Sequence, residues 1–540
     1  MTRNKQLSVI ILIWAISTAA ICFFMFGNNK EKDNDDYENQ QQHHTTNEVG
    51  ETGEDGESDG LTYGLADGRE GFIQSYLAES GLWRPNKKAL VMRSGESDTI
   101  ECTFNTMPTE VVWKSEDDSI AKITNSSQSG GVKAIAKGST YVAAYFEGRK
   151  VLKVPVHVDR ETLPPLSEIE KSRFKMVDGV YVNPNAKKTD KATIMMAGDL
   201  MFVSEQQRFA YQDGTFNFNP SFEYVRDLMK SADFSIGNFE TVTDSSKPYK
   251  WEQTKVYPGF GSDLVPNCNA PVTSMDAVRY GGFDAVFTAN NHCLDLGLPS
   301  LLETAKSLER YNILYTGTFA DENTPRYMML DLNGIKVAIL SYTTYLNLWD
   351  FGQTKEEVLL HTNHYTQDTA ERTRSDIAHA KQNGAEYVIV SMHWGFVNTF
   401  SPSRKMENIA QDVADMGADY IFGHHSHTIH RHELLTAADG RTVPVVFSAG
   451  NFVHSMNTAK NKRNRDGIVI QIELERDSNG AVTAKQGYIP LFSERNFRGE
   501  RYVTLPVDPE LNGGYTSKRL TKSDARIRKA LGEDIPKVEH

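Results

Sequence analysis

Hydrophobic and polar positions alternate in two different ways along this chain. Between residues 86 and 158, runs such as "KVLKVPVHV" show the two-residue alternation and β-branched content of strands. From about residue 190, short apolar runs are separated by amphipathic stretches with a helical period, such as "LPSLLETAKSLERYN" at 298–312. The first pattern predicts a small β-sandwich, and the second predicts a largely parallel sheet flanked by helices.

The elements expected after residue 190 are short. Strands are expected at 192–197, 233–236, 284–288, 336–342, 387–392, 419–423 and 443–449, with helices at 298–312, 366–384 and 404–417. The basic, proline-containing residues 501–540 are expected to form a peripheral C-terminal extension, separate from the domain of residues 190–500.

The amino-terminal region is defined by its hydrophobicity. Residues 7–26 carry no charge and are long enough to cross a bilayer as a helix. Arg3 and Lys5 precede this segment. The positive-inside rule therefore predicts a single-pass cell-membrane protein, with its amino terminus in the cytoplasm and the bulk of the chain outside the cell. We expect residues 1–27 to be a cytoplasmic stub and uncleaved anchor; a cleaved signal peptide is the alternative. Residues 28–60 are acidic and too polar to bury a core, which predicts a disordered linker.

Length and charge narrow the classes of protein. The 540 residues exceed what one hydrophobic core ordinarily serves, so several domains are expected. The net charge of −13 argues against a nucleic-acid partner, which would require a basic face.

Candidate chemistry is concentrated where the expected strands end. Nearly every strand after residue 190 runs into a cluster of Asp, Glu, Asn or His, as in "GNFET" at 237–241 and "GHHSH" at 423–427. Ligands of α/β sheets bind at the carboxyl ends of the strands, so these clusters should meet in one crevice. Imidazole, carboxylate and amide groups suit divalent Zn, Mn or Fe, so the pattern predicts a metal site. A polar loop network without a metal is the alternative.

The histidine-rich stretch at 424–430 contributes to that crevice. His425 and His427 are one residue apart, so along the end of a strand they would point the same way and grip one ion or two. His424 would face away, and His430 is the weaker candidate.

Several ordered motifs give residues 190–500 a resemblance to a known family. The motifs are "GDLMF" (198–202), "GNFET" (237–241), "ANNHCLDLG" (289–297), "MHWG" (392–395), "GADYIFGHHSH" (417–427) and "SAGNFV" (448–453). They resemble the CapA/PgsA family of capsule and poly-γ-glutamate biosynthesis proteins, whose fold is similar to that of calcineurin-like metallophosphoesterases. The resemblance implies an α/β/β/α sandwich within an overall α/β class.

Residues 86–158 resemble the bacterial immunoglobulin-like domains of group 2. The resemblance rests on Trp113, on Gly131-Val132 and on the segment from Lys137 to Thr140. It implies a small all-β domain on the bacterial surface, between the transmembrane helix and the α/β domain.

The CapA/PgsA resemblance also implies roles for individual residues. His292 would be the catalytic, proton-donating imidazole beside the leaving group. The implied metal ligands are Asp199, Glu240, Asn291, His393, His425 and His427. The residues expected to hold these ligands in place are Asn238, Asn290, Asp295, His424 and Asn451. Asn238 is the rival of Glu240 for the bridging position.

One departure from the phosphoesterase pattern concerns Met201. The pattern has Asp-x-His where this chain has Asp199-Leu200-Met201, so one imidazole ligand is missing. A two-metal site stabilises both the attacking and the leaving oxygen, so the loss weakens one metal position or leaves one ion. The sequence leaves open whether the site holds one ion or two. It also leaves open whether the site cleaves its substrate or only binds it.

Two functions fit these predictions. The first is an extracytoplasmic metal-dependent hydrolase acting on an anionic polymer such as poly-γ-glutamate, or on another cell-surface phosphoester. The second is a non-catalytic accessory subunit that binds the polymer and recruits membrane-bound synthase subunits. In either case a basic rim can bind the polymer; its expected residues are Lys460, Lys462, Arg463 and Arg465. A solvated loop is the alternative for that segment.

Overall fold

A computed structural model describes most of the chain from residue 84 onwards. The described residues are 84–85, 90–92, 94–103, 111–126, 129–146, 148–158, 165–212, 215–245, 247, 249–250, 268–347, 354–454, 461–495, 497–498 and 502–539. The predicted anchor (1–27) and linker (28–60) lie outside them. Within these ranges, no helix is both long and apolar enough to cross a membrane.

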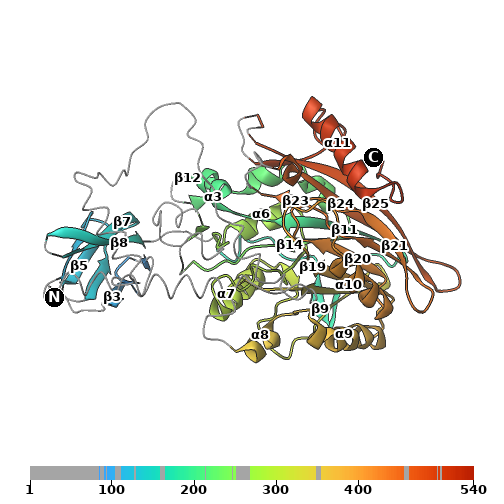
Figure 1. The fold of residues 1–540 in the computed structure, drawn as a ribbon, viewed down its shortest axis with the longest axis horizontal. Helices are drawn as coiled ribbons and strands as arrows, with labels where there is room; N and C mark the ends of the chain where they lie inside the picture. The colour runs from blue at the N-terminus through green and yellow to red at the C-terminus, as the bar shows by residue number, and fades with distance from the viewer. Residues whose placement is uncertain are drawn as a thin grey trace, which may run out of the picture. The chain divides into compact units, whose positions relative to one another are not determined.

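Residues 84–158 form two four-stranded sheets with a common core (Figure 1). Their orders are β1-β3-β6-β5 and β2-β8-β7-β4. The strands are β1 (Arg84–Pro85), β2 (Leu90–Met92), β3 (Ser97–Thr103), β4 (Val111–Ser115), β5 (Ala121–Ser126), β6 (Ser129–Ala134), β7 (Gly138–Phe146) and β8 (Arg149–Val158). Trp113 is buried in the core, where a Cβ on Gly130 would lie 2.5 Å from its ring. Membership of the immunoglobulin-like group stays a prediction.

The larger domain contains two further sheets, each of mixed direction. The first runs β21-β22-β20-β19-β18-β17-β10-β9. Its strands are β9 (Lys175–Val177), β10 (Val180–Val182), β17 (Met328–Leu332), β18 (Ile335–Thr343), β19 (Tyr387–His393), β20 (Tyr420–His424), β21 (His432–Thr436) and β22 (Thr442–Val446).

The second sheet of this domain runs β16-β15-β14-β11-β24-β25-β26, with β23 beside β11. Its strands are β11 (Lys191–Leu200), β14 (Phe234–Phe239), β15 (Ala285–Phe287), β16 (Leu314–Thr316), β23 (Asn451–Val453), β24 (Asp466–Arg476), β25 (Val482–Glu494) and β26 (Val503–Pro506). A separate two-stranded ribbon pairs β12 (Tyr211–Gln212) with β13 (Thr215–Phe216).

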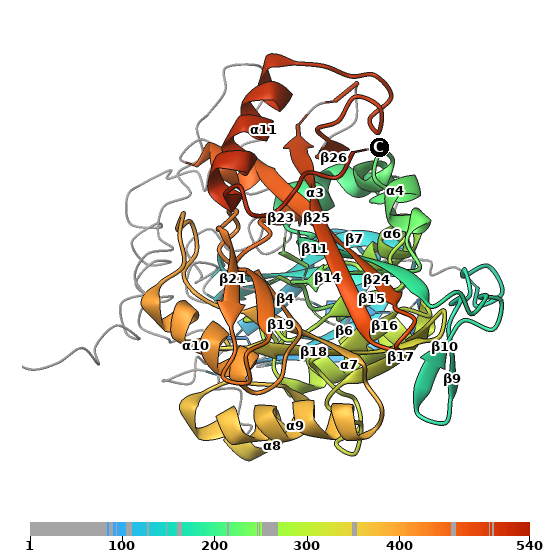
Figure 2. The same cartoon turned by 90° about the vertical axis from the view of Figure 1, so that its right-hand side faces the viewer.

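Helices cover the outer faces of both sheets (Figure 2). On β11, Ile194 and Met196 face the core between the sheets, whereas Met195 and Ala197 face the layer that contains α4 and α6. The helices and 3-10 turns are α3 (Ser204–Ala210), η2 (Asn219–Phe222), α4 (Arg226–Ser231), α6 (Ser274–Tyr280), α7 (Leu298–Arg310), α8 (Lys355–His361), η3 (Gln367–Thr369), α9 (Ala370–Gln382), α10 (Arg404–Asp415), η4 (Lys462–Arg465) and α11 (Lys518–Leu531). The result is a layered α/β/β/α arrangement, in place of the single sheet that the periodicity predicts.

The residues after 500 belong to this domain and are not a separate extension. Strand β26 pairs with β25, and α11 buries Leu520, Ile527 and Leu531 in the core between the sheets. The guanidinium of Arg526 donates to Asp466 Oδ1 and Oδ2 at 2.5 and 2.6 Å. The sequence pattern did not reveal this docking, because the apolar face of α11 is short and surrounded by charge.

Two backbones approach each other closely where Gly198 of β11 passes Gly450, directly before β23. A Cβ on Gly198 would lie 1.9 Å from the carbonyl oxygen of Gly450, which cannot rotate away. We predict that Gly198→Ala lowers the free energy of unfolding by about 1–3 kcal/mol or more, because the strands must separate. Urea denaturation followed by circular dichroism measures this loss. Gly480→Ala, in open space at φ +86°, is the matched control and should cost only about 1 kcal/mol. Equal losses in the two variants would contradict the prediction.

Candidate metal centre

Strands from both sheets deliver polar residues to one edge of the domain. Asp199 lies near the end of β11, Glu240 follows β14, His393 ends β19, and His425 and His427 follow β20. All five side chains are buried. Three groups have ligand atoms close enough to hold an ion: Asp199, His393 and His424; Glu240, His425 and His427; and Cys268, His292 and Asp295. The strand-end clusters therefore meet in the folded chain.

Glu240 lies at the centre of this arrangement. Its Oε1 atom accepts no hydrogen bond and is surrounded by four imidazole nitrogens. The distances from Oε1 are 3.6 Å to His393 Nε2, 3.9 Å to His292 Nε2, and 4.0 Å to both His425 Nδ1 and His427 Nε2. At these distances none of the imidazole nitrogens makes a direct hydrogen bond to Glu240 Oε1.

The distances from Oε1 to His393, His425 and His427 fit donors that share a metal ion. Ligand atoms about 2.0–2.2 Å from one ion lie roughly 3–4 Å from each other. Both ring nitrogens of His425 are buried without a hydrogen-bond partner, as is Glu240 Oε1. Burying polar atoms without hydrogen-bond partners costs folding free energy. A bound cation would give a partner to Glu240 Oε1 and to the His425 nitrogen that faces it. The residues present therefore fit a divalent ion.

The conformation of the loop after β20 explains how its histidines converge. Strand β20 ends at His424, so His425 and His427 do not follow strand alternation. Both adopt left-handed backbone conformations, with φ values of 98° and 57°. Such conformations are rare outside glycine and are found at functional sites. The side chains of His425 and His427 do converge on the centre. The expected cause, alternation along a strand, was wrong, because a left-handed loop turns both side chains inward.

His427 is oriented by two oxygen atoms. Its Nδ1 lies 3.0 Å from Asp199 Oδ2 and 3.1 Å from Asn451 Oδ1, which are both acceptors. Nδ1 therefore carries the proton, and Nε2 presents its lone pair towards Glu240. Asn451 is thus one of the two groups that orient the His427 ring.

His393 lies within a second chain of contacts. Its Nε2 is 2.8 Å from Asn291 Oδ1, and its Nδ1 is 2.8 Å from His424 Nδ1. The other nitrogen of His424 lies 2.7 Å from Ser391 Oγ. His424 therefore contacts His393 directly and does not face away from the site. The Asn291 amide donates to Asn347 Oδ1 at 3.4 Å, which turns Asn291 Oδ1 towards His393.

Asn238 and Glu240, the rivals for the bridging position, are clearly separated. The amide of Asn238 donates to Asp199 Oδ1 at 2.8 Å and to Glu240 Oε2 at 3.3 Å. Asn290 donates to Asn238 Oδ1 and to the carbonyl oxygen of Phe239. Asn238 thus holds both carboxylates and Asn290 holds Asn238, while Glu240 Oε1 occupies the centre.

His292 lies beside the centre with both nitrogens engaged. Its Nδ1 is 2.7 Å from Asp295 Oδ2, and its Nε2 is 3.8 Å from Cys268 Sγ. The backbone N–H of Cys268 donates to the same Asp295 oxygen, and Asn347 donates to the other. Sequence reasoning missed Cys268 and Asn347, since neither lies in a strand-end motif. This geometry suits an oriented proton donor better than a metal ligand.

The pKa values of these groups are set mainly by burial. Burial raises the pKa of Glu240 well above its usual range, and the nearby Asp199 charge adds to the effect. Burial acts in the same direction on Asp199, but the hydrogen bond from His427 outweighs it and lowers that pKa.

The imidazoles divide into two kinds. Burial lowers the pKa of His424 to about 4, and lowers those of His393 and His425 well below their usual value. These rings are neutral at pH 7 and can offer lone pairs to a metal. Burial also opposes the charged form of His292, but the Asp295 carboxylate outweighs it and raises that pKa well above its usual value. His292 is therefore a cation that can donate a proton.

The expected basic rim is only partly available. Lys460 lies outside the described residues. Lys462 is exposed, and the guanidinium of Arg463 lies 4.1 Å from the ring centre of Phe400. Arg465 turns inward, where it donates to Glu494 Oε1 at 2.6 Å and to the carbonyl oxygen of Ser493 at 2.7 Å. Arg465 is therefore a structural ion pair and not part of an open rim.

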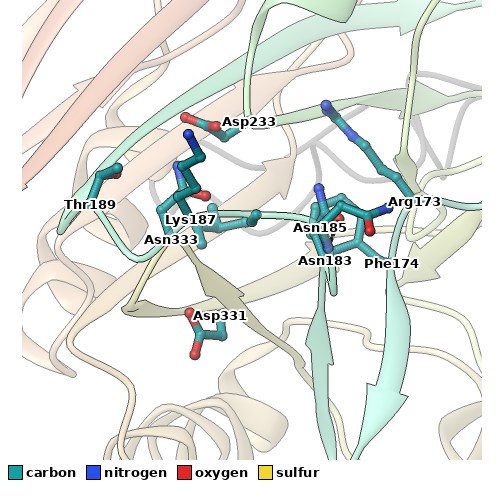
Figure 3. Close-up of a pocket in the computed structure, with 11 residues that line it drawn as sticks. Arg173, Phe174, Asn183, Asn185, Lys187, Thr189, Asp233, Asp331 and Asn333 are labelled. Atoms are coloured by element: carbon teal, nitrogen blue, oxygen red, sulfur yellow. Dashed lines mark hydrogen bonds between the residues drawn. The ribbon is translucent and has the colours of Figure 1, made fainter.

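A hollow of about 370 Å³ lies at the opposite ends of the strands (Figure 3). Arg173, Asp233 and Asn333 line it, and each is already hydrogen-bonded within the chain. The hollow thus lacks the unpaired buried groups found around Glu240.

Comparison with known proteins gives a consistent set of relatives. Residues 193–456 match the family model described as "Bacterial capsule synthesis protein PGA_cap". The capsule biosynthesis protein CapA of Bacillus anthracis is 27% identical over 343 residues, covering 63% of this chain and 75% of that protein. The PGA biosynthesis protein CapA of Bacillus subtilis (strain 168) is 25% identical over 293 residues, covering 54% and 70%. A solved structure of domains 4 and 5 of the S-layer protein SbsC is 20% identical; it covers 14% of this chain and 50% of that one, with a TM-score of 0.13 that is too low to bear on the fold.

The buried ring of His430, in the loop after β20, should make the stability of the protein depend on pH. Burial lowers its pKa to about 4, and its Nε2 lies 2.9 Å from the carbonyl oxygen of Thr399. The folded chain then binds fewer protons than the unfolded chain between pH 6.5 and 4, so stability falls as the pH falls through this window. His430→Gln should reduce that fall by about 1.4 kcal/mol per pH unit. Urea denaturation in excess chelator between pH 4.5 and 7.5 measures the slope. Identical slopes in the two proteins would contradict the prediction.

Proposed function

Because residues 193–456 belong to the CapA/PgsA family of bacterial capsule synthesis proteins, we propose that this chain acts in making or exporting an anionic capsule polymer. The polymer class that the relatives suggest is poly-γ-glutamate. We assign the chain the role of a divalent-metal-dependent hydrolase that cleaves an amide or phosphoester bond of such a polymer.

The environment of Glu240 Oε1 carries this proposal. A buried carboxylate oxygen without a hydrogen bond lies 3.6–4.0 Å from one nitrogen each of His393, His425 and His427, which suits a shared metal ion. We assign the ligands as Asp199, Glu240, Asn291, His393, His425 and His427. Mn, Zn or Fe suits this mixture of imidazole, carboxylate and amide donors.

His292 favours cleavage over simple binding. A divalent ion would supply Lewis acidity and lower the pKa of water. His292 would hold a proton on Nε2 for the leaving group, while Asp295 fixes the ring through Nδ1 at 2.7 Å. A protonated imidazole fixed in this way can pass its proton to a leaving group, which the neutral ligand imidazoles cannot do.

The accessory subunit is the second candidate, and the basic turn supports it. Lys462 and Arg463 lie on η4, next to Asn464, whose carbonyl oxygen accepts a hydrogen bond from Asn451 at 3.0 Å. Asn451 in turn contacts His427, so the turn is connected to the centre. In either role we assign Lys462 and Arg463, together with Lys460 from the sequence pattern, to the binding of polymer carboxylates.

We also propose that the chain is anchored in the cell membrane by residues 7–26, with residues 61–540 outside the cell. The uncharged length of this segment and its basic flank support the proposal. An anchor of this kind would hold the metal centre near membrane-bound synthase subunits.

Metal content tests the proposed centre directly. The full-length chain in detergent should retain a divalent ion after gel filtration, measured by inductively coupled plasma mass spectrometry. His425→Ala/His427→Ala should lose that ion and abolish the release of glutamate or phosphate, because two ligands are removed. His432→Ala is the matched control, since His432 is buried but contacts Gln486 at 2.9 Å, outside the centre. A wild-type chain that binds no divalent ion would falsify the proposal.

The proton-donor role makes a separate prediction. His292→Gln should retain the metal content of the wild type but lower kcat by about 10²–10⁴. Unchanged turnover would remove His292 from the mechanism. If the wild type cleaves neither bond class, yet the double variant stops polymer production in cells, the accessory role is the correct one.

A further inference from the structure

Met201 lies beside strand β23 at the edge of the centre. In a parallel pair, the N–H of one residue donates to the carbonyl oxygen of the residue preceding its partner. The N–H of Asp199 donates to Gly450 O at 3.1 Å, in agreement with the pair Asp199–Asn451. The N–H of Met201 donates in the same way to Val453 O at 2.7 Å. The partner of Met201 is therefore the next residue, His454.

The direction of the side chains follows from this register. Paired residues on adjacent strands project from the same face of the sheet, and successive residues alternate between faces. On β23 the register shifts once, because Asp199 pairs with Asn451 and Leu200 with Val453, so Phe452 is an extra, bulged residue. Asp199 and Asn451 both reach His427 Nδ1, so their face is that of the metal centre. Leu200 and Val453 face the opposite apolar layer. The following pair, Met201 and His454, returns to the face of Asp199.

The surroundings of His454 agree with that position. Only 2% of its surface is exposed. Burial lowers its pKa to about 3; the charge of His427 lowers it further, and that of Asp199 opposes this. The ring is therefore neutral at pH 7, the form that binds a metal, and it lies within the electrostatic reach of both residues.

We propose that His454 supplies, from the neighbouring strand, the imidazole ligand that Met201 cannot provide. It would complete the metal position on the Asp199 and His427 side of the centre. The idea rests on the proposed metal-dependent function and extends it, because the phosphoesterase pattern has this ligand directly after β11, at position 201, and not directly after β23. A centre completed in this way has enough imidazoles for two ions.

Moving the imidazole back to position 201 tests the idea. The full-length chain in detergent is titrated with Mn²⁺ and with Zn²⁺ against a chromophoric chelator, and Mn²⁺ electron paramagnetic resonance reports the ligand field. His454→Ala should weaken one metal position roughly 10- to 100-fold or more. Met201→His in the His454→Ala background should restore the lost affinity, because the imidazole returns to the paired position. His432→Ala and thermal unfolding control for the loss of a buried ring and for the fold.

Each outcome bears on a different statement. Loss of affinity in His454→Ala with recovery in the double variant supports the assignment. Wild-type affinity in His454→Ala overturns it and leaves the metal centre intact. Loss without recovery, in a double variant that unfolds at the wild-type temperature, also overturns it, since position 201 would then not be equivalent. A wild type that binds neither ion refutes the proposed function itself.

Discussion

The burial of Glu240 is the constraint on which the rest of the site depends. One oxygen of the Glu240 side chain lies fully inside the protein without a hydrogen bond, and a buried polar atom without a partner destabilises the fold unless a ligand satisfies it. Asn238 relieves only the other oxygen. The remaining oxygen is surrounded by imidazoles at distances that suit a shared cation. The strand ends, the left-handed loop and the support of Asn238 and Asn290 all serve this one environment.

The two carboxylates show how environment separates chemically similar groups. Burial raises the pKa of Glu240, whereas His427 lowers that of Asp199, although both side chains are fully buried. His292 and His393 differ in the same way, because Asp295 faces only His292. Neutral rings that can bind a metal therefore lie beside one charged ring that can donate a proton. Opposed pKa shifts of this kind mark a division of chemical roles.

Much of the fold and of the site could be predicted from local pattern. The strands at 191–200, 234–239, 387–393 and 420–424 lie close to their expected bounds, because their burial is visible as apolar runs. The strand-end rule brought Asp199, Glu240, His393, His425 and His427 together. The family resemblance, and not periodicity, indicated two stacked sheets, because a run of apolar residues shows that a face is covered but not by what. For the same reason α11 was set apart from the domain.

By itself, the sequence determined which residues can bind a metal and at which end of the strands they lie. It also determined that position 201 holds a methionine. The tertiary structure alone decided which atom each residue presents, since these choices depend on contacts between residues far apart in the chain. The proton on His427 Nδ1 is fixed by Asp199, 228 positions away, and Arg465 is turned inward by Glu494. The pairing of Met201 with His454 likewise exists only once β23 lies against β11, because strand register is a property of two segments and cannot be read from one.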